Sequence, residues 1–97
     1  MADFLLLMHD DVPAGTAIAD WGPYLARLQS AGVFRGGSRI GRGICVRRSG
    51  TAPPIASHLG GYLRIESDDF AQAERLLAGN PVFEAGGTIE IRELPRG

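Results

Sequence analysis

The sequence contains no lysine, a single cysteine and no long apolar run. The lone Cys45 cannot form an internal disulfide, and no segment approaches the roughly 20 apolar residues that a membrane-spanning helix requires. The apolar stretch from Phe4 to Met8 is too short for a signal peptide and lacks a basic flank. We therefore expect a cytoplasmic protein that does not cross a membrane.

Acidic residues are missing from the middle of the chain. No aspartate or glutamate occurs between Trp21 and Ile65, whereas seven of the ten arginines lie there, although the net charge of the whole chain is only −1. These arginines either lie on a solvated hairpin and pair with acids nearer the two ends, or they form a site for an anion. Both interpretations stay open on the sequence alone.

Length and composition set the size of the fold. A chain of 97 residues forms one small domain, residues 1–97, and buries roughly two thirds of its unfolded surface. Hydrophobic residues make up 44% and charged residues 22%, which is typical of a folded globular protein and not of a disordered segment.

The spacing of apolar residues predicts two helices. Trp21, Tyr24, Leu25 and Leu28 recur at helical spacing, and Gly32 follows the end of that helix. A second helix is predicted after a cap at Ser67 or Asp68, and its apolar stripe ends before residues 79–81.

Four strands are predicted around these helices. Residues 3–9 carry leucine at odd and even positions, as a central strand does when both of its faces are covered. Residues 33–46 place Ile40, Ile44 and Val46 at even positions, and Cys45 on this strand is predicted to be a small buried residue. Residues 62–66 and 87–94 complete the set, the last with isoleucine alternating with charged residues.

The order strand, helix, strand, strand, helix, strand predicts an α+β fold. It fits a ferredoxin-like sandwich, in which a four-stranded antiparallel sheet carries both helices on one face. The first strand would then expose apolar side chains on the open face, and such a patch usually marks an association surface. We therefore predict a homodimer joined through the open sheet face.

Several segments resemble the YCII-related proteins, also called the DGPF domain family, of the dimeric α+β barrel superfamily. The resemblance covers nearly the whole chain. It rests on the first strand ending in LMHDD, on Trp21-x-x-Tyr24-Leu25-x-x-Leu28-x-x-x-Gly32 followed by GG, and on GGYLRIE leading to FAQAERLLAGNPVFEAGGTIEIRE. The resemblance implies a ferredoxin-like dimer whose two sheets face each other, with a pocket between the sheet and the first helix.

Two positions depart from the family pattern. Some members carry a histidine eleven residues before the glycine matched by Gly32, and it forms the family's proposed proton-transfer pair with an aspartate. Trp21 stands there in this chain, and its indole cannot accept a proton from a substrate. The DGPF motif should precede the third strand, where this chain reads TAPPIASHLGG and has Ser57 and His58.

The candidate catalytic residues are His9, Asp11 and His58. His9 and Asp11 follow the first strand and project to the same side of an extended chain, and His58 precedes a strand. A metal site would need a third ligand from His58 or from a carboxylate elsewhere, and we predict no metal and no cofactor. The candidate ligand-binding residues are Trp21, Tyr24, Arg39, Arg42, Ser57 and Arg64.

Three functions fit these residues, and we place them in the following order. The first is binding of a small anionic metabolite, with Trp21 in the pocket wall and with His9, Asp11 and an arginine at its mouth. The second is a cofactor-free lyase or isomerase that moves a proton between histidine and aspartate, so whether the protein is an enzyme stays open. Nucleic-acid binding comes last, because the stacking aromatics that it needs on the sheet reduce to Tyr62.

Overall fold

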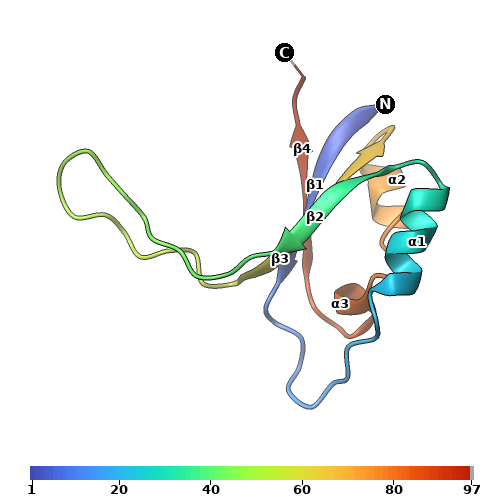
Figure 1. Cartoon of the computed structure of the whole chain (residues 1–97), viewed down its shortest axis with the longest axis horizontal. Coiled ribbons are helices and arrows are strands. Elements are labelled where there is room, and N and C mark those ends of the chain that lie inside the picture. The colour runs from blue at the N-terminus through green and yellow to red at the C-terminus, as the bar shows by residue number, and fades with distance from the viewer. Residues whose placement is uncertain (97) are drawn as a thin grey trace.

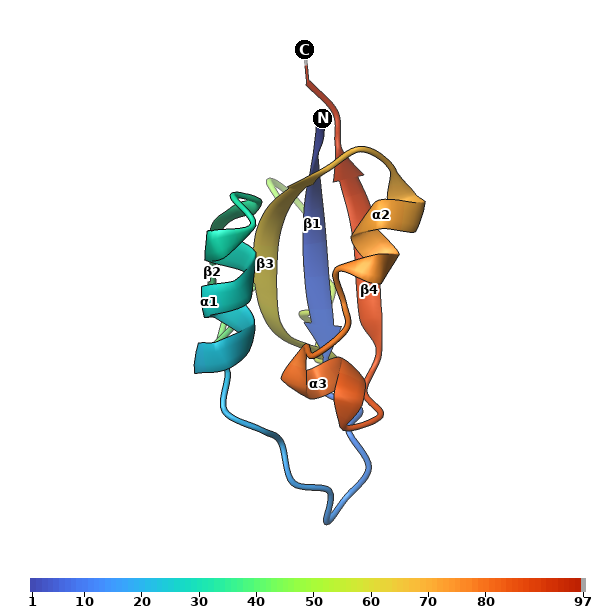
Figure 2. The same ribbon diagram turned by 90° about the vertical axis from the view of Figure 1, so that its right-hand side faces the viewer.

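The computed structural model describes residues 1–96 and contains one antiparallel sheet of four strands. The strands are β1 (Ala2–His9), β2 (Phe34–Arg39), β3 (Leu59–Ser67) and β4 (Ile89–Leu94), and they lie in the order β2-β3-β1-β4. The helices of this part of the chain are α1 (Gly22–Ser30), α2 (Phe70–Arg75) and α3 (Pro81–Glu84). Figure 1 and Figure 2 show all three helices on the same face of the sheet. The predicted α+β class and the four-stranded antiparallel sheet are confirmed.

Both predicted helices are present, but the prediction missed a third helix of one turn, which follows α2. The residues expected only to end a helix also begin α3. The Asn80 side-chain oxygen accepts hydrogen bonds from the backbone N–H groups of Val82 (3.0 Å) and Phe83 (3.1 Å), and Pro81 occupies the first turn, where its missing N–H is not needed. Asn80 is fully buried, so this cap is part of the core.

The predicted strand over residues 33–46 is also wrong in its second half. β2 ends at Arg39, and residues 40–58 form an arm that projects from the body of the protein (Figure 1). Alternating apolar residues make a strand only where a neighbouring strand and a covering layer exist, and the arm has neither. Ile44 and Val46 are therefore 85% and 80% exposed, and Cys45, predicted to be buried, is exposed as well.

The arm also enlarges the molecule. The Cα radius of gyration is 14.9 Å, whereas a compact domain of this length has a radius of about 12.5 Å. Within residues 1–96, no backbone hydrogen bond beyond those of the helices and strands involves residues 41–57. The arm is therefore held only at its base, where the Ile40 N–H donates to the Gly60 carbonyl (3.0 Å).

The core lies between the helices and one face of the sheet. Phe4, Leu6 and Met8 of β1 are at most 5% exposed, and they point to the helices because every second residue of a strand shares a face. Their partners across the ladder are Ile65 opposite Phe4 and Leu63 opposite Leu6, both nearly fully buried. This face excludes water and supplies most of the hydrophobic stabilisation.

The other face of the sheet has no helix on it. Leu5, Leu7 and Tyr62 lie near its centre and are half-buried, and Leu7 lies opposite Tyr62 in the ladder. Ion pairs run along the same face, between Asp3 and Arg96 (2.9 Å), Glu66 and Arg35 (2.6 Å), Glu66 and Arg96 (3.2 Å), and Glu90 and Arg92 (3.2 Å). His9 forms a hydrogen bond with Glu90 there (2.9 Å). We call this surface the open face.

Helix α1 lies where the sequence predicts a helix, although its first residue is Gly22 and Trp21 takes the cap position. Pro23 lies in its first turn, Tyr24 and Leu28 are buried on the sheet, and Gly32 adopts a φ of 73° just beyond the last turn, a conformation that favours glycine. Within residues 1–96, no helix combines the length and the apolar character that a bilayer span demands.

Candidate ligand pocket between α1 and the sheet

A pocket of about 340 Å³ lies where the start of α1 meets the ends of β2 and β3. This volume is at the lower end of the range for small-molecule sites, about 300 to 1,000 Å³. Its apolar lining comes from α1 and from three strands: Trp21, Leu25, Phe34, Met8 and Leu63. A small apolar group therefore has walls from four separate elements.

Glycines keep β2 and β3 close together at the pocket floor. A Cβ atom on Gly37 would lie 2.5 Å from the Leu63 side chain and 2.5 Å from the Tyr62 carbonyl oxygen, so no larger residue fits without movement. A Cβ atom on Gly61 would lie 3.2 Å from the Ser38 carbonyl oxygen and 3.4 Å from Met8. Glycine at positions 37 and 61 thus allows β2 and β3 to approach each other closely.

Trp21 forms one wall, and the residue behind it holds it there. Its ring packs edge-on against Tyr24, with the ring centroids 6.0 Å apart. Tyr24 is buried, and its hydroxyl donates to the Leu76 carbonyl of the helix layer (2.7 Å). Burial raises the pKa of the Tyr24 phenol, so it stays a neutral donor. Tyr24, predicted to bind a ligand, therefore supports Trp21 from outside the pocket.

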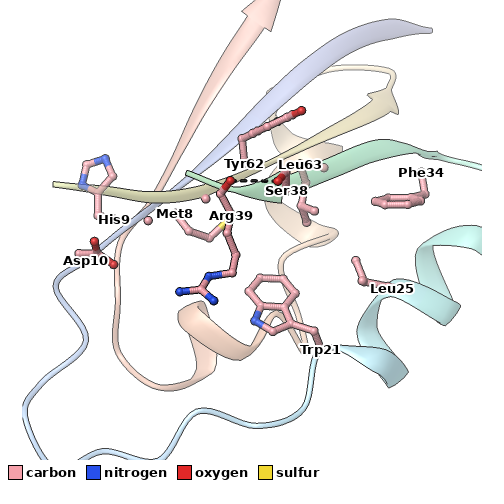
Figure 3. A pocket seen from close by; sticks show the side chains of 13 residues that line it. Met8, His9, Asp10, Trp21, Leu25, Phe34, Ser38, Arg39, Tyr62 and Leu63 are labelled. Carbon is pink, nitrogen blue, oxygen red and sulfur yellow. Dashed lines mark hydrogen bonds between the residues drawn. The ribbon is translucent and has the colours of Figure 1, made fainter. Parts of the chain in front are cut away.

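Three polar residues, Arg39, Ser38 and Asp10, complete the lining. Figure 3 shows the Arg39 guanidinium beneath the strands, on the same side as Trp21. Among residues 1–96, no carboxylate lies within 4.0 Å of this guanidinium. The Ser38 hydroxyl instead donates to the Arg39 carbonyl (2.9 Å). Arg39 is therefore a cation at an apolar wall without a carboxylate partner in the described chain.

His9 borders this pocket, but its ring lies on the open face (Figure 3). Its Nε2 is 2.9 Å from a carboxylate oxygen of Glu90, and its ring centroid is 4.8 Å from that of His58. The hydrogen bond from His9 holds the pKa of the Glu90 carboxyl below its usual range.

Asp11 is engaged elsewhere. One carboxylate oxygen accepts the Thr88 N–H (2.8 Å) and the other accepts the Thr88 hydroxyl (2.5 Å). These two bonds lower the pKa of the Asp11 carboxyl, the hydroxyl bond most strongly. The structure thus brings His9 close to His58, a contact that the sequence left open, and pairs Asp11 with Thr88 just before β4.

The remaining predicted ligand residues divide between the pocket and other surfaces. Trp21 and Arg39 line the pocket. Arg42 and Ser57 lie on the exposed arm, and Arg64 is exposed on the open face.

Several lining residues were missed from the sequence. Leu25 and Phe34 belong to the predicted helix and strand, but their periodicity marks them equally well as core. Asp10 was set aside in favour of Asp11. Glu90, the partner of His9, was missed as well. Its alternation with Ile89 and Ile91 indicated that it faces away from the helices.

No model of a known protein family matches the chain, and no curated protein matches it either. The resemblance to the YCII-related proteins therefore stays a prediction that rests on the LMHDD strand end, the motif from Trp21 to Gly32 and the C-terminal segment.

Proposed function

We propose that the protein binds a small anionic metabolite with an apolar body in the pocket beside α1. The observation that carries this proposal is the position of Arg39, a guanidinium without a carboxylate neighbour among residues 1–96, beside the indole of Trp21. Ligand sites commonly combine apolar walls with a few convergent polar groups that fix the orientation of the ligand.

The chemistry of the lining favours a monocarboxylate. A guanidinium binds a carboxylate through two parallel hydrogen bonds, and the apolar walls exclude the water that would compete for them. The Asp10 carboxylate also lines the pocket and would repel a ligand with several negative charges. An aryl or branched-chain monocarboxylic acid is therefore a better fit than a phosphate ester.

We further propose that two copies associate through their open faces, as a ferredoxin-like dimeric α+β barrel of the YCII-related kind. The strand order β2-β3-β1-β4 and the single helix layer support this arrangement. Leu5, Leu7 and Tyr62 are half-buried on a face without helices, and a second copy would cover them.

Ligand binding is tested by thermal denaturation against a panel of aryl and branched-chain carboxylic acids, each paired with its neutral amide. We expect acids, and not amides, to raise the melting temperature, since a ligand that binds only the folded state stabilises it by about 2.7 kcal/mol at 100 times its Kd. Arg39→Ala should abolish this shift, and Arg42→Ala, three residues along the chain on the arm, should retain it.

An acid that stabilises wild type and Arg39→Ala equally would place the ligand outside this pocket. Trp21→Ala tests the apolar wall in the same thermal assay, since it removes the indole and leaves the Arg39 guanidinium in place.

The dimer is tested by light scattering at micromolar concentration. We expect a dimer for wild type and a monomer for the Leu5→Glu, Leu7→Glu double variant, because buried charges without partners are costly. Phe83→Glu is the matched control: Phe83 is 44% exposed but lies in α3, on the helix layer, and its substitution should leave the dimer intact. A monomeric wild type would refute the association.

A second candidate function is proton transfer without a cofactor, as in a lyase or isomerase. It is favoured by Asp10 and Arg39 lining the same pocket, since a carboxylate can remove a proton that a cation-bound carboxylate has acidified. Proton exchange of a bound acid in deuterated water, followed by NMR, tests this function. Exchange in wild type and not in Asp10→Asn would favour catalysis over binding alone.

A further inference from the structure

Both histidines of the chain meet one carboxylate on the open face, at the same end of the sheet as the α1 pocket. His9 is the last residue of β1, Glu90 lies in β4, and His58 immediately precedes β3. β1 lies between β3 and β4, so the three side chains come from three adjacent strands. One donor atom from each lies within 4.8 Å of the others.

The backbone fixes this arrangement. The His9 N–H donates to the Thr88 carbonyl (2.9 Å) and the Asp10 N–H donates to the His58 carbonyl (2.7 Å), so both flanking chains are tied to the end of β1. The register between β1 and β3 shifts at this point: Met8 lies opposite Gly61, but His9 lies opposite Leu59. Such a bulge re-aims side chains, and here it accompanies the approach of the two imidazoles.

The chemistry of the three donors matches a transition-metal site. Two imidazoles and one carboxylate form the protein ligand set of several zinc sites with an open fourth position, and imidazole also suits nickel, cobalt and copper. Donors in a tetrahedral zinc site lie about 3.3 to 3.6 Å apart, as bond lengths of about 2.0 to 2.2 Å require. His9 and Glu90 are already 2.9 Å apart, so closure needs mainly a small movement of His58 at the exposed base of the arm.

Two further features prepare the cluster for a cation. The side chains of His9 and Glu90 are 21% and 32% exposed, which leaves a route from solvent. The second oxygen of Glu90 is oriented by Arg92 (3.2 Å), as outer-shell partners orient metal ligands.

We propose that His9, His58 and Glu90 form a binding site for a divalent transition-metal ion of the zinc type, with one coordination position left for water or a small ligand. The site lies on the open face and shares only His9 with the border of the α1 pocket, and it does not depend on the proposed metabolite or on the dimer. Asp11 takes no part, because Thr88 occupies both of its carboxylate oxygens.

The test uses the full chain without an affinity tag, titrated with zinc chloride in a calorimeter and with cobalt chloride followed by its visible absorption. We expect one ion per chain and a cobalt spectrum of low coordination number. Because the chain has only two histidines, both of their ring-proton NMR signals should move on addition of zinc.

Variants assign the ligands. Loss of an outer-shell partner costs roughly 10- to 100-fold in metal affinity, so His9→Ala and His58→Ala should each cost about 100-fold or more, and Glu90→Gln at least about 10-fold. Matched controls should bind as wild type: Asp11→Asn removes a nearby carboxylate, Glu93→Gln removes another carboxylate of β4, and Cys45→Ser removes the single thiol.

The absence of zinc and cobalt binding by wild type at high micromolar concentration overturns the proposal. Binding that survives His58→Ala, or that disappears in Cys45→Ser, overturns it as well. His58 lies on an exposed segment before β3, so its substitution leaves the core untouched, and circular dichroism of each variant verifies the fold.

Discussion

The apolar side chains on the two faces of β1 are covered to different extents. On the helix side, Phe4, Leu6 and Met8 are at most 5% exposed and contact other apolar side chains. On the open face, Leu5 and Leu7 of the same strand are half-buried, and ion pairs run along that face. Leucine density alone therefore does not identify the core; what covers each face decides it.

Packing contacts and polar interactions are therefore separated between the two faces of the sheet. The covered face contains the packing contacts, and at its edge the α1 pocket interrupts them. The open face holds the ion pairs of residues 1–96 and the His9, His58 and Glu90 cluster. Substitutions on one face should consequently act on stability, and those on the other on association, pH dependence and metal binding.

The largest expected effect on stability contrasts two neighbouring leucines, one on each face of β1. Leu6→Ala removes a fully buried side chain, and we expect it to lower the free energy of unfolding by about 2 to 5 kcal/mol. Leu7→Ala removes an identical side chain from the open face. In dilute monomer it should cost clearly less, since a half-exposed side chain loses less burial. Urea denaturation of both variants measures the contrast.

Measuring the stability of the Leu6→Ala and Leu7→Ala variants at several protein concentrations separates the two faces further. Stability of Leu7→Ala should fall further behind wild type as concentration rises, because dimerisation stabilises the folded state by mass action. Equal losses for the two variants at every concentration would contradict the assignment of the two faces.

An intermediate effect is expected where the sheet closes under the pocket. Gly37→Val adds side-chain atoms where a Cβ atom already meets Leu63 and the Tyr62 backbone, and overpacking of this kind typically costs about 1 to 3 kcal/mol. Gly41→Val is the control, because a Cβ atom on Gly41 meets nothing within 4 Å. A thermal melt in which both variants match wild type would show that the strand approach at Gly37 is unimportant.

The smallest effect is a pH dependence confined to the open face and the turn before β4. The pKa values of Asp3, Asp11 and Glu90 are lowered in the folded protein, mainly by hydrogen bonds from Arg96, Thr88 and His9. A lowered folded pKa contributes stability above the unfolded value, which is lost as pH falls through the folded one. We therefore expect the free energy of unfolding to decline below about pH 4.

Asp11→Asn and Glu90→Gln should make this decline shallower when urea midpoints are compared across acidic pH. Glu93→Gln is the matched control, since Glu93 is exposed on β4 and forms no ion pair within residues 1–96. An unchanged acid limb in the first two variants would mean that these bonds do not persist in solution.

Much of the fold was predictable because it depends on local patterns. The apolar run of β1, the spacing from Trp21 to Leu28 and the glycine after α1 each encode their element directly. The arm was not predictable, because Ile40, Ile44 and Val46 alternate as a strand would, and only the absence of a neighbouring strand prevents one. Alternating apolar residues indicate that a segment can form a strand, but they do not show whether a neighbouring strand is available.

The site was only partly predictable for a related reason. Trp21 and Arg39 were identified by residue type and position, and both line the pocket. The pairing of His9 with Glu90 joins residues 81 positions apart, and it depends on β4 lying beside β1. No spacing rule within the sequence reports such a contact, since strand order is set by the whole fold.

The strand order also has a consequence for synthesis of the chain. β1 is made before every other strand and yet needs both β3 and β4, so one of its edges stays unpaired until β4 has left the ribosome. An apolar strand with a free edge is a template for intermolecular pairing. A stalled nascent chain that ends before residue 89 would thus expose an aggregation-prone edge, and release of the last strand would remove it.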